Sequence, residues 1–394
     1  MAFEHRPAVK AAILLPALVV FSIVAPGCKP RSQQQNANRE QPGEKTARWV
    51  AEYRPPDSLS QSGNYLALFS FNSISAVTPQ IVYVAGDTPY PNDPNRRNAI
   101  VVKTTDGGQT WVERPLAVSG LTIQALNSIH FANASIGVAV GVDPDGAGLI
   151  FNTTDGGASW TGSKLNFKQT PTFVWLQPSG TGWMAGVTSP TGEEDEEGGP
   201  SDILATRDFG RSWYSQSHVS VSISTLTFVD DKNGWAGGYP AAIYHTTDGG
   251  QSWDRQRTEL ERGEGIPQVT GTGAKDFSVT GLAFTDIANG WAAARSEKER
   301  EGRMIGTTNG GKTWSQLWIS NAEKMRAVTF LNPMEGWATT DDGHYVYHTT
   351  DGGHSWLSEP INFVQNVPLY QIAAPDSSHV WAVGGGGIFR RVIE

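Results

Sequence analysis

Polar and apolar residues alternate along short segments of this chain, and residues 224–229 show the pattern most clearly. Leu226 and Phe228 fall on one face of an extended chain, and Thr225 and Thr227 fall on the other. A period of two over this length is typical of a half-buried β-strand. Three more short segments follow before the pattern starts again. We therefore expect four strands in this unit, at residues 224–229, 234–237, 242–246 and 253–257.

The same unit recurs along the chain as a β-rich segment ending in Phe, a polar turn and the tripeptide Gly-Trp-Ala. Phe228, Phe284 and Phe330 precede the three clearest copies, and weaker copies follow Phe131, Trp175 and Ala374. The least regular unit comes first, at residues 73–84. The chain is therefore predicted to contain seven units.

A second motif, Thr-x-Asp/Asn-x-Gly-x-Ser/Thr-Trp, occurs six times and is called the Asp turn below. Its side chain at the third position can accept hydrogen bonds from backbone N–H groups downstream, glycine supplies positive φ, and the tryptophan packs between units. Because an amide replaces the carboxylate in one copy, we interpret the motif as structural and not catalytic. The six pairs are Asp106 and Trp111, Asp155 and Trp160, Asp208 and Trp213, Asp248 and Trp253, Asn309 and Trp314, and Asp351 and Trp356.

The spacing of the Asp turns indicates the fold class. Successive turns lie 40 to 61 residues apart, and four-stranded units repeating at about that period indicate an all-β fold, a seven-bladed β-propeller. The seventh unit lacks an Asp turn and a fourth strand. Residues 49–53 resemble the missing Trp-led strand, so we expect the closing blade to be shared by the two ends of the propeller, residues 47–394.

Strand order divides the loops between two faces of the predicted ring. The Asp turns and the first hairpins share one face, whereas every long insertion falls on the other: residues 86–98, 142–148, 187–202, 258–276 and 295–303. Binding and catalytic residues are often carried by loops on a rigid scaffold. The irregular face is therefore the predicted functional face.

Composition narrows the function classes. The 394 residues include 44 glycines and 14 tryptophans, only 18% are charged, and the net charge is −9. This composition suits a repeat protein with many tight turns, and an acidic chain does not offer the basic stripe that nucleic-acid binding needs. His130 and His245 lie in predicted strands without a second ligand at fixed spacing, so we predict packing roles, no metal and no cofactor.

The N-terminus has the pattern of an export signal. Basic residues precede an apolar stretch at residues 11–24, which is short for a membrane span, and small residues then lead to Cys28, the single cysteine. The end of this segment resembles the lipobox of bacterial lipoproteins, although Ala25 stands where that family usually has Leu. We expect a signal peptide at residues 1–27, lipid attachment at Cys28 and a polar tether at residues 28–46. Ordinary cleavage and an uncleaved anchor are the alternatives.

The Asp turns, the Gly-Trp-Ala strands, the Trp-led N-terminal strand and the lipobox together resemble the photosystem II assembly/stability factor family of seven-bladed propellers. The resemblance spans about residues 49–394. It implies a non-catalytic scaffold that faces the periplasm or cell exterior and binds a protein partner, one associated with a membrane. No arginine cluster for such a partner is apparent from the sequence.

The alternative function is carbohydrate binding or cleavage, because sialidases and xyloglucanases share the Asp turn. A glycosidase needs two carboxylates across a cleft. Asp143, Asp145, Asp286 and Glu335 are available, but we interpret them as solvated turn residues, and we predict no catalytic residue. The acidic stretch at residues 193–197 is interpreted as a disordered loop, with weak calcium or basic-partner binding as the alternative.

Overall fold

The computed structural model describes residues 47–53, 70–90, 93–114, 116–166, 170–187, 199–258, 260, 277–296, 301–320, 323–361 and 367–393. Cys28, the predicted signal and tether, and the acidic residues 193–197 lie outside these ranges. No helix in the described part is long and apolar enough to cross a membrane.

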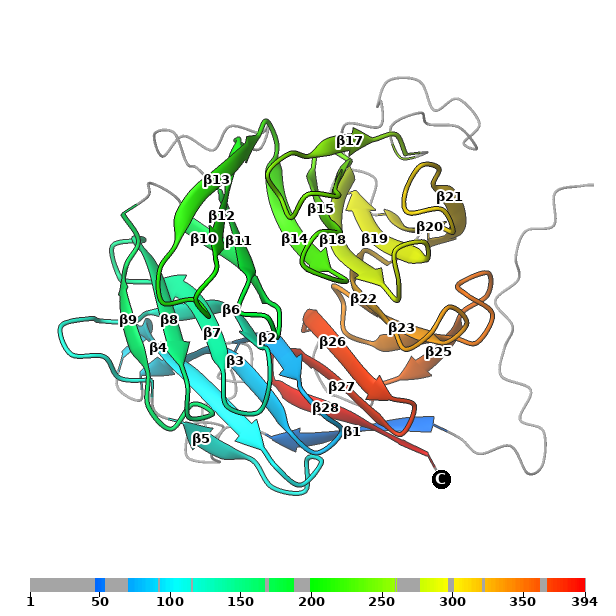
Figure 1. The fold of residues 1–394 in the computed structure, drawn as a ribbon. Helices are drawn as coiled ribbons and strands as arrows, with labels where there is room; N and C mark the ends of the chain where they lie inside the picture. Colours follow the sequence, from blue (N-terminus) through cyan, green and yellow to red (C-terminus); the bar gives the residue numbers. More distant parts are fainter. Residues whose placement is uncertain are drawn as a thin grey trace, which may run out of the picture. The chain divides into compact units, whose positions relative to one another are not determined.

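Seven antiparallel four-stranded sheets make up the described chain, and they follow one another around a common centre (Figure 1). The prediction of a seven-bladed β-propeller is confirmed. Blades 1 to 3 consist of β2 (Ser70–Ala76), β3 (Val82–Tyr90), β4 (Asp93–Thr104) and β5 (Val112–Arg114); β6 (Ala125–Phe131), β7 (Gly137–Val142), β8 (Gly148–Thr153) and β9 (Thr161–Lys164); and β10 (Thr170–Leu176), β11 (Gly182–Val187), β12 (Ser201–Thr206) and β13 (Tyr214–Val219).

The other blades have the same order, and the first strand of every blade lies at the centre. Blades 4 to 7 consist of β14 (Ser222–Phe228), β15 (Gly234–Tyr239), β16 (Ala242–Thr246) and β17 (Asp254–Gln256); β18 (Phe277–Phe284), β19 (Gly290–Ser296), β20 (Glu301–Thr307) and β21 (Ser315–Ser320); β22 (Met325–Phe330), β23 (Gly336–Thr340), β24 (Tyr345–Thr349) and β25 (Leu357–Pro360); and β26 (Leu369–Asp376), β27 (His379–Gly384), β28 (Gly387–Ile393) and β1 (Ala47–Tyr53).

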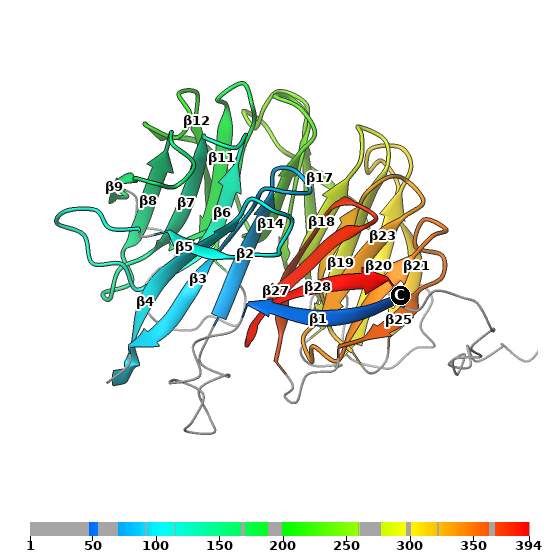
Figure 2. The ribbon, with the colours of Figure 1, turned by 90° about the horizontal axis from the view of Figure 1, so that it is seen from below.

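The closing blade joins the two ends of the propeller as predicted. β1 pairs antiparallel with β28, with Trp49 opposite Arg391, and the two strands lie side by side in Figure 2. The Trp49 indole donates a hydrogen bond to Glu359 of blade 6 at 3.0 Å. In the same way, Trp314 of the fifth Asp turn donates to Gln256 of blade 4 at 3.1 Å. Trp49 thus takes the place of an Asp-turn tryptophan.

Among the described residues, the core forms seven hydrophobic clusters, each shared by two adjacent blades. A repeated aromatic sandwich fills four of them. Between blades 3 and 4, Trp183 stacks on Phe228 with ring centroids 3.5 Å apart, and Trp253 meets the same Phe edge-on at 5.9 Å. Tyr83, Trp235 and Trp291 stack equivalently on Phe131, Phe284 and Phe330. The Phe and Trp positions of the sequence pattern are therefore the contacts between blades.

The Asp turns have the hydrogen bonds that their residue types suggest. In the first copy, Asp106 accepts hydrogen bonds from the Thr110 backbone N–H at 2.9 Å and from the Thr104 hydroxyl at 2.8 Å. In the fifth copy, Asn309 accepts the equivalent two bonds, but its amide donates to the Thr313 hydroxyl, whereas the Asp residues accept at that point. The third copy differs in another way, because Phe209 holds a φ of 63° where other copies have glycine.

Asp turns also join neighbouring blades, as in the fourth copy. In blade 4, the Gly249 N–H donates to the Lys232 carbonyl in the first hairpin of the same blade. The Gly249 carbonyl accepts a hydrogen bond from the Trp183 indole of blade 3 at 2.8 Å. The hairpins and the Asp turns therefore share one face, as the strand order predicts.

One of the loop predictions for the opposite face is wrong. Residues 86–98 lie mostly in the long hairpin of β3 and β4, whose ladder continues from Asp87 opposite Ala99 to Pro89 opposite Arg97. The polar residues of this segment suggested a loop. A two-stranded extension beyond the blade has no core to cover, so its strands need no apolar face. Of the other predicted insertions, residues 188–198, 261–276 and 297–300 lie outside the described ranges.

Candidate functional site at the channel mouth

The first strands of all seven blades surround a central cavity of about 830 Å³. Such a strand has an unpaired edge, whose backbone N–H and C=O groups need partners when they are buried. Side chains from the neighbouring blade supply them. For example, Ser75 accepts a hydrogen bond from the Phe131 N–H at 2.9 Å, and Thr280 donates to the Met325 carbonyl at 3.1 Å.

Each first strand is irregular at the same position, four residues before its Phe or the equivalent residue. There the register of the first two strands slips, as in a β-bulge. Five blades carry a small polar residue at this position, and its side chain donates to a carbonyl of the next blade. These five residues are Asn72, Asn127, Thr172, Ser224 and Thr280.

Blades 6 and 7 depart from this rule. They carry Arg326 and Tyr370 at the equivalent positions, and the guanidinium of Arg326 lies 5.0 Å from the Tyr370 ring centroid. Thr339 of β23 donates to the Leu369 carbonyl at 3.0 Å. A break in an otherwise regular repeat is where a functional residue is expected.

Two further residues complete this group, which we call the basic sector: Arg295, Arg326, Asp341 and Tyr370. Arg295 forms an ion pair with Asp341, and Arg326 approaches the other oxygen of Asp341 at 3.3 Å. All three charged side chains are partly exposed, by 21 to 27%. Two guanidinium groups share one carboxylate, so the sector carries one net positive charge on an otherwise acidic protein. It lies at the end of the cavity where the first strands begin, on the irregular face.

Deeper in the cavity, the wall is neutral and partly aromatic. Phe173 and Trp175 lie two residues apart on β10, and both are half-buried although they belong to an innermost strand. His130 packs against Trp175 with ring centroids 4.3 Å apart. Its Nδ1 lies 3.2 Å from the Leu176 N–H and accepts from it, so the other ring nitrogen carries the proton. Burial lowers the pKa of His130 to about 4, and the ring is neutral near pH 7.

The structure does not bring the four carboxylates considered from the sequence together. Asp143 and Asp145 lie in the turn between β7 and β8, whereas Asp286 and Glu335 lie in the first hairpins of blades 5 and 6 on the opposite face. Asp143 is also buried, contrary to expectation. It forms an ion pair with Lys164 at 2.5 Å and accepts from backbone N–H groups of its own turn. Asp286 likewise accepts from two backbone N–H groups in its hairpin.

The other predicted positions lie apart from the basic sector. His245 stacks on Trp235 at 4.5 Å within blade 4. Within the part of the chain that the structure describes, no three His, Cys, Asp or Glu side chains are grouped closely enough to hold a metal ion. The arginine cluster that the sequence did not reveal is formed by residues of blades 5 and 6, and it becomes visible only when they fold together.

Together, these observations define the chain as a seven-bladed β-propeller of the Asp-turn type, with a basic sector at one mouth of its channel. Among proteins of known function, it is 26% identical over 294 residues to the photosystem II assembly lipoprotein Ycf48 of Synechococcus sp. (strain CC9902), a match covering 66% of this chain and 82% of that protein. The chain is a homologue of this assembly factor, which confirms the resemblance indicated by the motifs. No family model matches the chain.

Solved structures agree on the fold. A structure of Ycf48 bound to D1 peptide has a TM-score of 0.60 and 18% identity, and the match covers 88% of this chain and 97% of that one. Ycf48 from Cyanidioschyzon merolae has a TM-score of 0.56 and 16% identity, covering 88% and 98%. A xyloglucanase from Xanthomonas campestris has a TM-score of 0.58 and 12% identity, covering 87% of this chain and 53% of the enzyme.

Proposed function

We propose that this protein is a non-catalytic scaffold that binds a segment of another protein over the channel mouth, at the basic sector. The proposal rests on one observation. In two adjacent blades, Arg326 and Tyr370 replace the small polar residue that bridges to the next blade elsewhere in the repeat. At the junction of blades 6 and 7, Thr339 bonds to the Leu369 carbonyl of the next blade. The larger Arg326 and Tyr370 side chains present a guanidinium group and an aromatic ring at the cavity.

The chemistry of the sector suits a protein ligand. A guanidinium group binds carboxylates through two parallel hydrogen bonds, and Tyr and Arg are enriched where protein surfaces meet. The relatives support this reading, because one solved Ycf48 structure contains a bound D1 peptide. We extend this to a partner that carries an acidic group, such as an Asp, a Glu or a chain terminus.

We further propose that the protein is exported and held at a membrane by lipid on Cys28. The sequence around Cys28 supports this, and so does the designation of the Ycf48 relative as a lipoprotein. Mass spectrometry of the mature N-terminus tests it directly. An acylated Cys28 is the expected result, and an unmodified N-terminus at another residue would contradict it.

The binding role is tested with the tagged full-length protein in membranes of its source cell. Chemical crosslinking followed by affinity purification should recover a specific protein partner, and Arg326→Glu should weaken recovery by about tenfold or more, because it reverses the charge of the sector. Lys312→Glu is the matched control, since this exposed residue lies in the fifth Asp turn on the opposite face. Equal recovery with both variants would contradict docking at the sector, and hydrolysis of a glycan by the pure protein would favour the carbohydrate alternative.

A further inference from the structure

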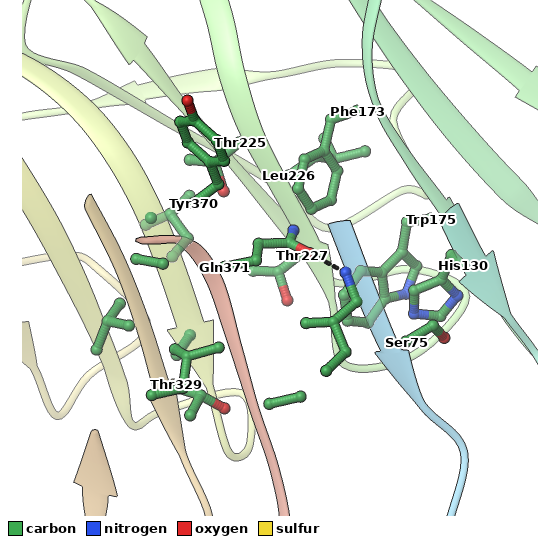
Figure 3. Close-up of a pocket in the computed structure, with 18 of the residues that line it drawn as sticks. Ser75, His130, Phe173, Trp175, Thr225, Leu226, Thr227, Thr329, Tyr370 and Gln371 are labelled. Atoms are coloured by element: carbon green, nitrogen blue, oxygen red, sulfur yellow. Dashed lines mark hydrogen bonds between the residues drawn. The ribbon is translucent and has the colours of Figure 1, made fainter. Parts of the chain in front are cut away.

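The cavity below the basic sector has two unlike walls. On β10, Phe173 and Trp175 are half-buried aromatic residues, and His130 of β6 packs beside Trp175. At the level of Trp175, the strands of blades 5, 6 and 7 carry the short residues Ala283, Thr329 and Ala373. Figure 3 shows Thr329 on the other side of the cavity from His130 and Trp175. Short side chains on one side leave space in front of the aromatic rings on the other.

The mouth above this space is also flanked by aromatic residues. Tyr370 of blade 7 lies across the cavity from Phe173 of blade 3 in Figure 3, and both side chains are partly exposed. An innermost strand of a propeller is remote from the outer surface, so this exposure is to the cavity. Apolar area left in contact with water inside a concave site is favourable for binding, because an apolar ligand group removes it from water.

The polar groups of the deep cavity are neutral. His130 carries its proton on Nε2 and is uncharged near pH 7 because burial depresses its pKa. The Trp175 indole nitrogen is buried without a hydrogen-bond partner. Ser75, Thr227 and Thr329 offer only hydroxyl groups at this level. Such a wall disfavours a charged group but accepts an aromatic ring with at most a neutral polar atom.

We propose that the partner segment inserts an aromatic side chain into the channel, between the Phe173–Trp175 wall and the Ala283–Thr329–Ala373 wall, while an adjacent acidic group pairs with the basic sector. This inference rests on the proposed protein-binding function and names the class of segment: an acidic residue beside an aromatic one. The cavity of about 830 Å³ exceeds the volume of any single side chain. An aromatic anchor in a desolvated pocket is a typical source of binding energy at protein interfaces.

Site-specific photocrosslinking tests the insertion. The photoreactive amino acid p-benzoylphenylalanine is placed singly in the full-length protein at Thr329 in the deep cavity, at Ser278 in the mouth, or at the exposed Leu357 on β25 as a control. Membranes of the source cell are irradiated, and the crosslinked peptides are sequenced by mass spectrometry. We expect adducts at 278 and 329 with one segment of the same partner, and no such adduct at 357. Replacing the aromatic residue of that segment with Ala should remove the adduct at 329.

The outcomes separate the two proposals. An adduct at 278 without one at 329 overturns the insertion and leaves protein binding at the mouth intact. No partner adduct at either position overturns both. A second pair of variants removes the dependence on the probe. Thr329→Trp fills the cavity and should weaken partner recovery by about tenfold or more. Thr329→Val keeps the volume of the side chain at this position and should leave partner recovery unchanged. Equal recovery with both variants, at unchanged thermal stability, contradicts the insertion.

Discussion

The side chain of Gln371 accepts a hydrogen bond from the backbone N–H of Ile74 at 2.7 Å, and this bond joins the last blade of the propeller to the first (Figure 3). Nearly 300 residues separate the two partners in sequence. The Ile74 N–H lies on the unpaired edge of β2, where the sheet offers it no partner. Ser73 and Ser128 likewise accept hydrogen bonds from the backbone N–H groups of Ile129 and Val174 in the next two blades. Seven edges facing a common channel are thus stabilised by side chains of their neighbours.

Replacing Gln371 should therefore weaken ring closure. Gln371→Leu leaves the nearly buried Ile74 N–H without an acceptor, and we expect the free energy of unfolding to fall by about 1–3 kcal/mol. Gln371→Glu keeps an acceptor oxygen and should cost less above the pKa of its carboxyl. Urea unfolding followed by circular dichroism measures both. Equal stability of the wild type and the Leu variant would show that the bond is not needed.

The propeller could be predicted because its interactions are repeated. Phe228 and Trp183 occupy positions that recur in other units, so one period of the sequence reveals the contacts between blades. The closing strand was also predictable, because Trp49 lies near its start, much as an Asp-turn tryptophan comes just before other fourth strands.

The basic sector could not be predicted in the same way, because it consists of exceptions to the repeat. Arg326 and Tyr370 have no motif of their own, and Arg295 and Asp341 belong to second strands and their turns in different blades. A signal was nevertheless present. Aligning the seven units on the Phe position places Arg326 and Tyr370 in a column otherwise filled by Asn, Thr and Ser. The importance of this position follows from the β-bulge and from the hydrogen bond to the next blade. Neither of these can be read from the sequence.

The aromatic sandwich between blades should account for much of the stability of the fold. Phe228→Ala removes a ring packed between Trp183 and Trp253, and we expect a loss of about 3–5 kcal/mol because a cavity is left in the core. Phe228→Leu is the matched control, since blade 3 carries Leu176 at this position, and it should cost roughly 1–2 kcal/mol. Denaturant titration measures both losses. Indistinguishable midpoints for the two variants would contradict the stacking argument.

A buried ion pair joins the closing blade to blade 6. Glu359 is 3% exposed and accepts hydrogen bonds from Arg391 at 2.7–3.0 Å as well as from the Trp49 indole. Glu359→Ala leaves the buried Arg391 charge without this partner, so we expect a loss of about 3–5 kcal/mol. Trp49→Phe removes one hydrogen bond to Glu359 and part of a buried ring, so it should cost less, about 1–3 kcal/mol.

Thermal unfolding of these two closure variants tests the prediction, and Glu359→Gln separates charge from geometry. The amide can still accept from Trp49, as Gln256 accepts from Trp314. A Gln variant as stable as the wild type would show that the charge of Glu359 contributes little. An Ala variant as stable as the wild type would contradict a role of this pair in closing the ring.

Acid should weaken the Asp turns, and an amide should protect them. Hydrogen bonds from the Thr110 side chain and backbone, and then from Thr104, lower the pKa of Asp106 to about 2. The carboxylate of the unfolded chain has a pKa near 4, so its stabilising effect is fully present above about pH 4 and is lost as the pH falls toward 2. The equivalent bonds lower the pKa of Asp155 to about 2 as well. Melting temperatures should therefore drop most steeply between pH 4 and pH 2.

The fifth Asp turn supplies the control for this prediction. Asn309 accepts the same two hydrogen bonds as the Asp residues, and its amide donates to the Thr313 hydroxyl. The double variant Asp106→Asn with Asp155→Asn should therefore retain both turns at pH 7. It should also lose less thermal stability than the wild type between pH 4 and pH 2. Asp106→Ala with Asp155→Ala removes the acceptors and should be less stable than the double amide at every pH, because the backbone N–H groups of the turns lose their partners. Melting curves from pH 2 to pH 7 compare the three proteins.

A double amide that loses stability with acid as steeply as the wild type would mean that other carboxylates dominate the acid transition. A double amide as unstable as the double alanine at pH 7 would mean that the negative charge itself, and not the acceptor geometry, holds the turn.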